Sequence, residues 1–178
     1  MYASTRYDDL KAVVYDLTES RSGQHCRTFL GDWQGKLICD DYAGYKACFA
    51  QGITELGCMA HARRKFFEVF ASNKSPVAGH ALDSIKALYR IEHKARRLKA
   101  DDRRRLRQKR AVPILDALHV WLKQQRELVP PGSAIANAIG YSLRRWQALT
   151  RYVDDGHAVI GRVEMWRGDV RSGISVGR

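Results

Sequence analysis

Two adjacent acidic residues, Asp40 and Asp41, follow directly on the apolar segment Leu37-Ile38-Cys39. Phosphoryl transfer with two metal ions needs carboxylates at rigid strand ends, because shared oxygens must hold two Mg²⁺ ions about 4 Å apart. Acidic residues after a strand are more often turn formers, so the pair alone is weak evidence. Asp16 ends an earlier β-branched segment and is better interpreted as a solvated turn residue.

A second group of reactive side chains follows at Cys58-Met59-Ala60-His61. The spacing is that of half a zinc site, but the other cysteines are scattered and no second half is evident. A phosphate-binding site at a helix start is the stronger interpretation, since amides and guanidinium groups there both favour anions. A solvated basic turn is the alternative. The residues proposed to contact DNA here are His61, Arg63, Arg64 and Lys65.

Positive charge is concentrated in one stretch of this chain, whose formal net charge is +12. Residues 90–110 hold eleven Lys and Arg against three acidic residues. A local field of this strength favours a polyanion, and nucleic acid is the default candidate. The alternative is an ordinary solvated helix face. Arg103, Arg104 and Arg105 are the predicted DNA contacts of this stretch.

Composition excludes several classes of protein. With 178 residues, 45% of them hydrophobic, the chain can build a buried core. No apolar run approaches the roughly 18 to 20 residues of a membrane span, and the N-terminus does not resemble a secretory signal. Four irregularly spaced cysteines do not indicate a disulfide framework, so a cytoplasmic protein is predicted. No nucleotide-binding glycine motif or serine-hydrolase motif is present.

The hydrophobic period changes along the chain. Short β-branched runs at 11–17, 36–39 and 53–57 predict strands, with helices near 25–30 and 43–50 between them, which is typical of an α/β core. From Met59 the apolar residues recur at helical spacing, with breaks at Pro113 and at Pro130-Pro131-Gly132. Trp121 and Trp146 lie on apolar helical stripes, so core packing is favoured over stacking on bases. The segment 161–178 has no period and is expected to be loose.

Two motifs together indicate a family. The segment Gly31 to Tyr45, around Leu37-Ile38-Cys39-Asp40-Asp41-Tyr42, resembles the second-aspartate region of bacterial transposases of the insertion-sequence-66 family. The segment Gly57 to Phe67, which contains His61-Ala62-Arg63-Arg64-Lys65, resembles the motif that follows it. Residues 81–89, 141–149 and 150–156 resemble later parts of that family in the same order. The resemblance covers roughly residues 7–160.

The resemblance implies a fold, a reaction and a set of partners. The fold would be a ribonuclease-H-like core with an Asp-Asp-Glu triad, interrupted by a mostly helical insertion. The reaction would be Mg²⁺-assisted attack by water, and then by a DNA 3′-hydroxyl, on phosphodiester bonds at transposon ends. Asp40 matches the second aspartate and is the predicted metal ligand, whereas Asp41 occupies a position that is often glycine. Partners would be DNA, further transposase copies and accessory element-encoded proteins at the bacterial nucleoid.

The sequence also departs from that family. The first aspartate of the triad would lie upstream of Tyr7, and the residues after Ile160 do not match, so the chain is expected to be truncated at both ends. Glu164 is the candidate for the displaced glutamate, because Arg162-Val163-Glu164 fits the residues around it. The predicted division is a partial ribonuclease-H-like core at 1–58, a helical region at 59–156 and a divergent tail at 157–178.

Three functions follow from these observations. The first is a transposase fragment that is inactive by itself, since only Asp40 of the three carboxylates is secure. The second is a non-catalytic protein that binds DNA through residues 90–110. The third is a decaying element product without function.

Overall fold

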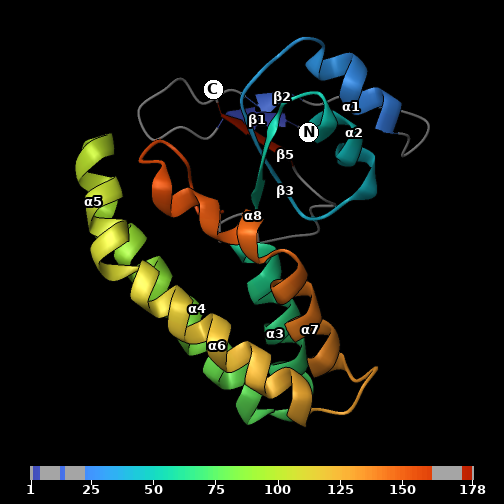
Figure 1. Ribbon diagram of the computed structural model, residues 1–178, viewed down its shortest axis with the longest axis vertical. Helices are drawn as coiled ribbons and strands as arrows, with labels where there is room; N and C mark the ends of the chain where they lie inside the picture. The colour runs from blue at the N-terminus through green and yellow to red at the C-terminus, as the bar shows by residue number, and fades with distance from the viewer. Residues whose placement is uncertain (1, 5–12, 15–22, 162–173, 178) are drawn as a thin grey trace.

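The computed structural model of the protein describes residues 2–4, 13–14, 23–161 and 174–177 (Figure 1). Asp16 and Glu164 lie outside the described residues. No helix within the described ranges has both the length and the apolar composition that crossing a membrane requires. Helices dominate the architecture, and a small sheet lies between the short helices of residues 23–50 and the longer helices that follow residue 58 (Figure 1).

Five strands of the described residues form one mixed sheet in the order β2-β1-β5-β3-β4. β3 and β4 are parallel, with Cys39 opposite Gly57. Because the carboxyl ends of parallel strands meet at the same edge, the residues that follow β3 and β4 lie close together. The strands are β1 (Tyr2–Ser4), β2 (Val13–Val14), β3 (Lys36–Cys39), β4 (Thr54–Gly57) and β5 (Ile174–Gly177).

Strand β5 corrects the expectation of a loose tail for residues 174–177, whereas residues 162–173 lie outside the described ranges. It lies between β1 and β3, parallel to β1 and antiparallel to β3. The alternation of apolar and small residues in Ile174-Ser175-Val176-Gly177 suits a strand, and β3 offers backbone groups with which it can pair. A pattern of four residues within a glycine- and arginine-rich segment is too short to predict from periodicity.

The two faces of β3 belong to two different apolar clusters. Leu37 and Cys39 pack with α1 (Gly23–Leu30), the short 3-10 helix η1 (Ala43–Tyr45) and α2 (Lys46–Ala50). Ile38, on the opposite face, packs with the helical region. This alternation follows from the period of two along a strand, and it explains why all three of these β3 residues are buried.

Six helices and a 3-10 helix follow β4 within residues 59–154, and serine residues cap two of them. Ser75 and Ser133 are N-caps whose hydroxyl oxygens accept from the amides of Ala78 and Ala136 at 3.3 and 3.2 Å. Pro113 lies in the first turn of its helix, where its missing N–H costs nothing. The elements are α3 (Met59–Asn73), α4 (Pro76–Ala95), α5 (Ala100–Arg110), α6 (Val112–Leu128), α7 (Ala134–Arg144), α8 (Trp146–Thr150) and η2 (Arg151–Asp154).

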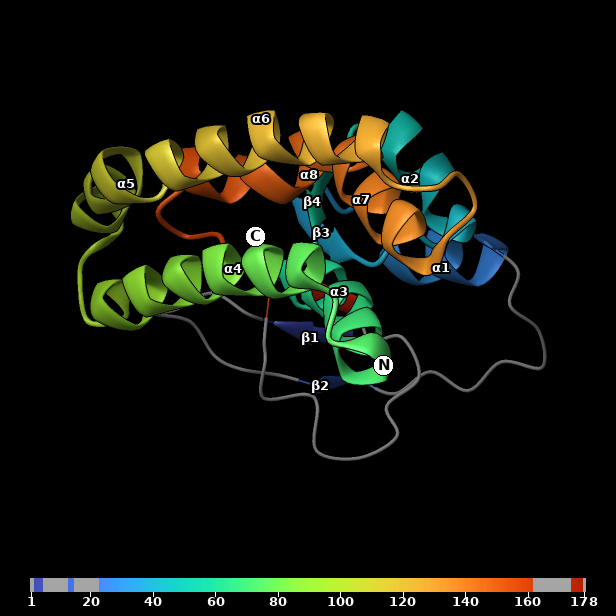
Figure 2. The ribbon, with the colours of Figure 1, turned by 90° about the horizontal axis from the view of Figure 1, so that it is seen from below.

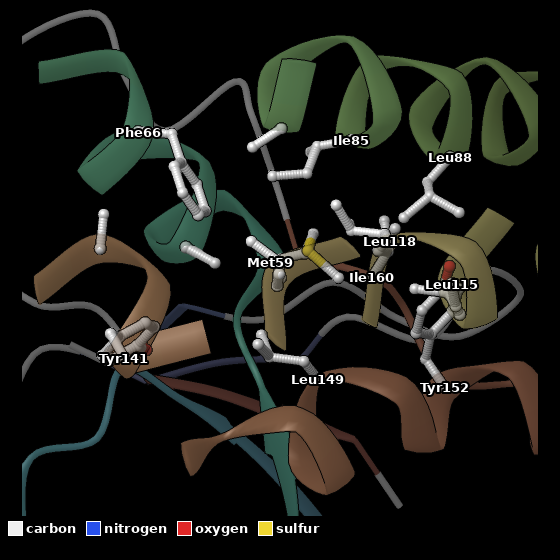
Figure 3. Packing of buried hydrophobic residues seen from close by; sticks show 14 of the residues in the cluster. Met59, Phe66, Ile85, Leu88, Leu115, Leu118, Tyr141, Leu149, Tyr152 and Ile160 are labelled. Carbon is white, nitrogen blue, oxygen red and sulfur yellow. The ribbon is translucent and has the colours of Figure 1, made fainter. Parts of the chain in front are cut away.

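The long helices α4 and α6 run alongside each other, and α5 joins them at one end (Figure 2). At the other end α3 and α7 pack against them and lead to the sheet (Figures 1 and 2). The main apolar cluster fills the space between these helices and includes Met59, Phe66, Ile85, Leu118 and Leu149 (Figure 3). Because Ile38 of β3 and Leu56 of β4 belong to the same cluster, the sheet and the helices share one core.

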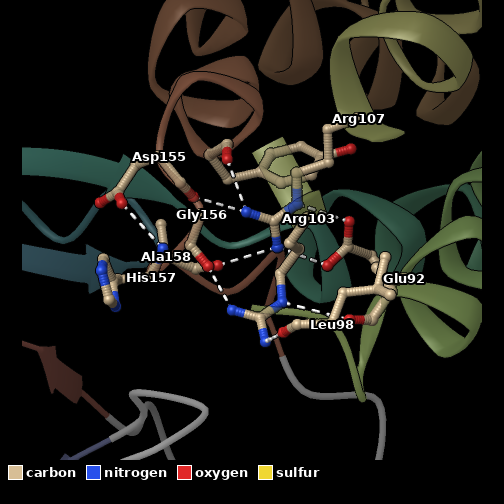
Figure 4. A network of polar contacts seen from close by, with 10 residues as sticks. Glu92, Leu98, Arg103, Arg107, Asp155, Gly156, His157 and Ala158 are labelled. Carbon is tan, nitrogen blue, oxygen red and sulfur yellow. Dashed lines mark hydrogen bonds and ion pairs between the residues drawn. The ribbon is translucent and has the colours of Figure 1, made fainter. Parts of the chain in front are cut away.

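A buried polar network fastens α5 to the segment that follows η2 (Figure 4). The Arg107 guanidinium forms a two-point ion pair with Glu92 at 2.8 and 2.6 Å, and donates to the carbonyls of Tyr152, Asp155 and Ala158. Arg103 donates to the carbonyls of Ala95, Leu98 and Gly156. Each guanidinium thus joins residues that precede α5 in the chain to main-chain carbonyls of the segment after η2, and holds the two parts of the chain together.

Candidate active site at the end of strand β3

Asp40 directly follows β3 and is half-buried, as expected for a residue at a strand end. The next parallel strand, β4, leads through Cys58 into α3, and the Cys58 amide donates to the Cys39 carbonyl at 3.1 Å. This bond holds the start of α3 against the end of β3. It brings the two sequence motifs, around Asp40 and around His61, to one edge of the sheet.

Helix α7, about one hundred residues after β3 in the sequence, also contacts this edge of the sheet. The Tyr141 hydroxyl donates to the Asp40 main-chain carbonyl at 3.3 Å. The Tyr141 ring lies 5.3 Å from the His61 ring, centroid to centroid, and the Lys65 ammonium lies 4.8 Å from the Tyr141 ring centroid. Tyr141 therefore connects the strand-end residue with the side of α3 that carries His61 and Lys65.

Asp41 has an unusual backbone conformation, with φ at +82°. This left-handed region disfavours residues other than glycine, asparagine and aspartate. The Asp41 carboxylate forms an ion pair with Arg145 at 3.2 Å, and the same guanidinium nitrogen contacts Glu55 of β4 at 2.6 Å. Arg145 follows α7, so both residues that grip the Asp40-Asp41 turn come from one short segment of the chain.

Burial shapes the electrostatics of this edge. It lowers the pKa of His61, and although Asp40 opposes that shift, the nearby Lys65 and Arg64 add to it. The imidazole is therefore neutral at pH 7 and can donate or accept a hydrogen bond, but it brings no charge to a phosphate. Burial also disfavours the charge of Arg145, yet the hydrogen bond and the negative charge of Glu55 outweigh it and raise the Arg145 pKa.

The four predicted DNA contacts of α3 do not form one cluster. His61 and Lys65 face Tyr141, whereas Arg64 is exposed and pairs with Glu68 at 2.7 Å. Arg63 lies over the Phe67 ring, 5.6 Å from its centroid. His61 and Lys65 are one helical turn apart, which places them on the same face beside Asp40. They are the two members of the set that belong to the candidate site.

Cys58 and His61 have the spacing of half a zinc site, but their surroundings do not favour a metal. Burial raises the pKa of the Cys58 thiol, and its sulfur is not ionised at pH 7 in this environment. Within the described ranges, no group of three or more His, Cys, Asp or Glu side chains is arranged to hold a metal ion. Cys26, Cys39 and Cys48 are buried in the smaller cluster, whereas Cys58 packs against the main one.

The basic stretch 90–110 divides into buried and exposed cations. Arg103 and Arg107 have no exposed surface, while the other nine Lys and Arg residues are exposed. The prediction that Arg103 contacts DNA therefore does not agree with the structure, because its guanidinium is committed to main-chain carbonyls. Arg104 and Arg105 are exposed and stay candidates, although Arg105 also pairs with Asp102 at 2.5 Å.

The tryptophans of the helical region are core residues, as predicted. Trp121 and Trp146 pack against the main apolar cluster. Each also contacts a histidine ring: His80 lies 4.1 Å from Trp121 and His119 lies 4.5 Å from Trp146, centroid to centroid. Each of these two indole rings therefore contacts a histidine ring of the protein itself.

The structure adds three residues that sequence reasoning does not identify as part of the site, namely Glu55, Tyr141 and Arg145. All three lie on or beside predicted elements, but no local spacing connects them with Asp40. Tyr141 and Arg145 are about one hundred positions away from it. The one available signal is that residues 141–149 resemble a segment of the same family in the same order.

At this edge of the sheet the strand-end aspartate Asp40 lies beside the start of the basic helix α3. The profile of the Transposase IS66 family matches residues 1–161, and the chain belongs to that family. It is 31% identical over 166 residues to the uncharacterized protein y4hP of Sinorhizobium fredii. It is 34% identical over 152 residues to the uncharacterized protein y4jD of the same organism.

These alignments cover 84% and 82% of this chain but only 30% of each relative. The chain thus spans less than a third of the length of the relatives that it matches. No solved structure matches the chain.

Proposed function

We propose that the chain is part of a transposase which, as a whole protein, cuts and joins DNA strands by metal-dependent phosphoryl transfer. Membership of the IS66 family supports the class of protein. The observation that carries the site is the position of Asp40, at the end of β3 and beside the face of α3 that bears His61 and Lys65. A carboxylate next to a lysine can serve a divalent cation and a DNA phosphate together.

The ribonuclease-H-like core belongs to the same proposal. The parallel pair β3 and β4, the mixed sheet and the helical region that follows support it. The proposal also places the protein in the cytoplasm at the bacterial nucleoid, where transposon ends, further transposase copies and accessory element-encoded proteins would be its partners.

The described residues do not by themselves fit the Mg²⁺ site that the family implies. Among them, Asp40 is the one carboxylate of this edge that Arg145 does not hold. A two-metal site needs several shared carboxylate oxygens. Glu164, outside the described residues, stays the proposed third carboxylate. We therefore propose that this chain is inactive in strand cleavage by itself.

The test is plasmid nicking by the purified chain in the presence of Mg²⁺ or Mn²⁺, with Asp40→Asn as the matched variant. The chain is expected to leave the plasmid intact. Nicking that requires the metal and is abolished by Asp40→Asn would show that the chain is active and that its carboxylates suffice. Nicking that persists in Asp40→Asn would remove Asp40 from the proposed site.

A second function, DNA binding without cleavage, is favoured by the exposed cations of α5 and its neighbours. Arg104, Arg105 and Lys109 are exposed on α5, away from the buried face that carries Arg103 and Arg107. Duplex DNA is expected to bind with an affinity that falls steeply with salt, because phosphate contacts release counterions. This surface is independent of Asp40, so it can be tested separately.

The experiment compares two charge-matched triple variants by fluorescence anisotropy at several salt concentrations. Replacing Arg104, Arg105 and Lys109 with Gln should weaken binding and make the salt slope shallower by about 0.9 for each phosphate that these side chains no longer neutralise. Replacing the exposed Lys46, Lys74 and Lys123 with Gln removes the same charge elsewhere and should have a smaller effect. Equal effects of the two triple variants would mean that net charge, and not this surface, determines binding.

A further inference from the structure

The carboxylates of Asp40, Asp41 and Glu55 lie near the carboxyl end of β3, and Arg145 contacts two of the three. The Arg145 guanidinium contacts Asp41 at 3.2 Å and Glu55 at 2.6 Å. From the described part of the chain, no hydrogen bond or ion pair reaches the Asp40 carboxylate, since Tyr141 bonds its main-chain carbonyl. Arg145 therefore engages two of the carboxylates in ion pairs and leaves the third available.

The same arginine holds a strained turn. Asp41 has a φ of +82°, a conformation that costs aspartate less than most residues with a β-carbon but more than glycine. The Arg145 side chain is only 10% exposed, so water screens its ion pairs less than it screens a pair on the open surface. Tyr141, which is 5% exposed, fixes the neighbouring carbonyl of Asp40. The two contacts act on consecutive residues and set the direction in which the Asp40 side chain leaves the strand.

We infer that Arg145 and Tyr141 are positioning residues, which hold the Asp40-Asp41 turn and keep Asp41 and Glu55 from binding a divalent cation. Only Asp40 is then presented to the cation. The role of Asp40 rests on the proposed function. The ion pairs by which Arg145 keeps Asp41 and Glu55 from a cation do not depend on that function. Hard cations such as Mg²⁺ and Mn²⁺ take several carboxylate oxygens where these are free. Loss of the arginine charge leaves Asp41 and Glu55 without the partner that holds them and frees their oxygens for a cation.

The test is a Mn²⁺ titration of the purified chain, followed by paramagnetic broadening of its backbone amide NMR signals. In the natural protein, broadening should centre on residues 40–42 and disappear in Asp40→Asn. In Arg145→Gln it should extend to Glu55 and persist when Asp40→Asn is added, because Asp41 and Glu55 now bind the cation. Arg144→Gln, which removes an exposed charge one residue earlier, should behave like the natural protein.

The outcomes separate this inference from the proposed function. If Arg145→Gln shows the same broadening as the natural protein, with the same dependence on Asp40, the positioning role of Arg145 is overturned and Asp40 stands. If the natural protein shows no broadening but Arg145→Gln does, the inference stands and the proposed role of Asp40 falls. If neither protein binds Mn²⁺, both are overturned.

A second variant keeps the inference testable if Arg145→Gln folds poorly. Glycine adopts a positive φ without strain, so Asp41→Gly in the Arg145→Gln background should restore the turn. Hydrogen exchange at the amides of residues 41 and 42 should accelerate at least about tenfold in Arg145→Gln and return towards the natural rate in the double variant. Tyr141→Phe, which removes only the hydroxyl, should accelerate exchange at the same amides. Unchanged exchange in both Arg145→Gln and Tyr141→Phe would contradict the positioning role.

Discussion

Arg107 is a charged side chain without exposed surface, and its ion pair with Glu92 is almost as deeply buried. Removing one member of a buried pair leaves the other charge unpaired, which typically costs about 3–5 kcal/mol. Arg107→Ala also abandons three main-chain carbonyls, so we expect a large fall in the free energy of unfolding. Urea denaturation followed by circular dichroism measures it.

The control for that prediction is Arg105→Ala, two positions earlier on the same helix. Arg105 pairs with Asp102 on the open surface, where such pairs contribute little. The midpoint of unfolding should be unchanged in this variant. Equal losses of stability in the two variants would show that α5 is sensitive to the removal of any arginine, and that the buried network has no special part.

His61 makes the stability of the protein depend on pH. Its pKa in the folded chain is lowered below 6.5 by burial, which outweighs the opposing charge of Asp40. The unfolded chain therefore binds the proton at higher pH, and unfolding is favoured as the pH falls. The contribution of His61 is complete above pH 6.5 and is lost as the pH falls towards the folded pKa.

We therefore expect His61→Gln to lose less stability than the natural protein when the pH is lowered from above the ordinary histidine pKa to below it. The measurement is the free energy of unfolding at a series of pH values. His93→Gln, which replaces a histidine on the exposed surface of α4, should leave the pH dependence unchanged. A pH dependence in His61→Gln as steep as that of the natural protein would contradict the role of His61.

At the residue scale, the sequence shows where arginines lie but does not show which of them are buried and which are exposed. Arg103 and Arg104 are neighbours of the same type in a run of three arginines, yet one is buried and the other exposed. The difference arises because the Gly156 carbonyl lies beside one face of α5, more than fifty residues further along the chain. No local pattern contains that information.

At the scale of elements, periodicity predicts most of the fold. The predicted strand at 36–39 has the bounds that the structure shows, and α7 begins directly after the predicted break at Pro130-Pro131-Gly132. These features depend on neighbours within a few residues, so the sequence contains their causes. Strand β5 pairs with strands far away in the sequence, and so do Tyr141 and Arg145 with the Asp40-Asp41 turn. Periodicity, which depends on near neighbours, predicts neither of these features.

The junction between α5 and the segment after η2 allows no extra atom. A β-carbon on Gly156 would lie 1.9 Å from the Ala100 carbonyl oxygen, so Gly156→Ala must push the two backbones apart. We expect the free energy of unfolding to fall by about 1–3 kcal/mol or more, as in other overpacked sites. The Arg103 contact with the Gly156 carbonyl would be disturbed as well.

Gly140→Ala is the matched control, because a β-carbon there meets only the flexible end of the Arg144 side chain at 3.2 Å. Gly140 lies inside α7, where alanine should stabilise the helix by about 0.5–1 kcal/mol. Chemical denaturation of both variants measures the difference. Similar stabilities for the two would mean that the α5 junction can open at little cost.

At the scale of the whole molecule, residues before and after the predicted domain boundary at residue 58 pack in one apolar core. Ile38 and Leu56 from the sheet pack in the same cluster as Ile85 and Leu118 from the helices. Polar contacts cross the boundary too: Arg151 donates to the Glu55 carbonyl at 2.7 Å, and Lys36 pairs with Asp155. The helical region is thus completed by β3 and β4.

A shortened chain of residues 59–161 should therefore lose cooperative unfolding. It retains the helices but exposes the apolar surface that Ile38 and Leu56 cover, so we expect retained helical circular dichroism, a broad thermal transition and binding of a hydrophobic dye. A chain of residues 23–161, which restores β3 and β4, should recover a sharper transition. A sharp transition in the 59–161 chain would mean that the helices fold as an independent domain, and that their contacts with the sheet position the Asp40 edge without stabilising the helical core.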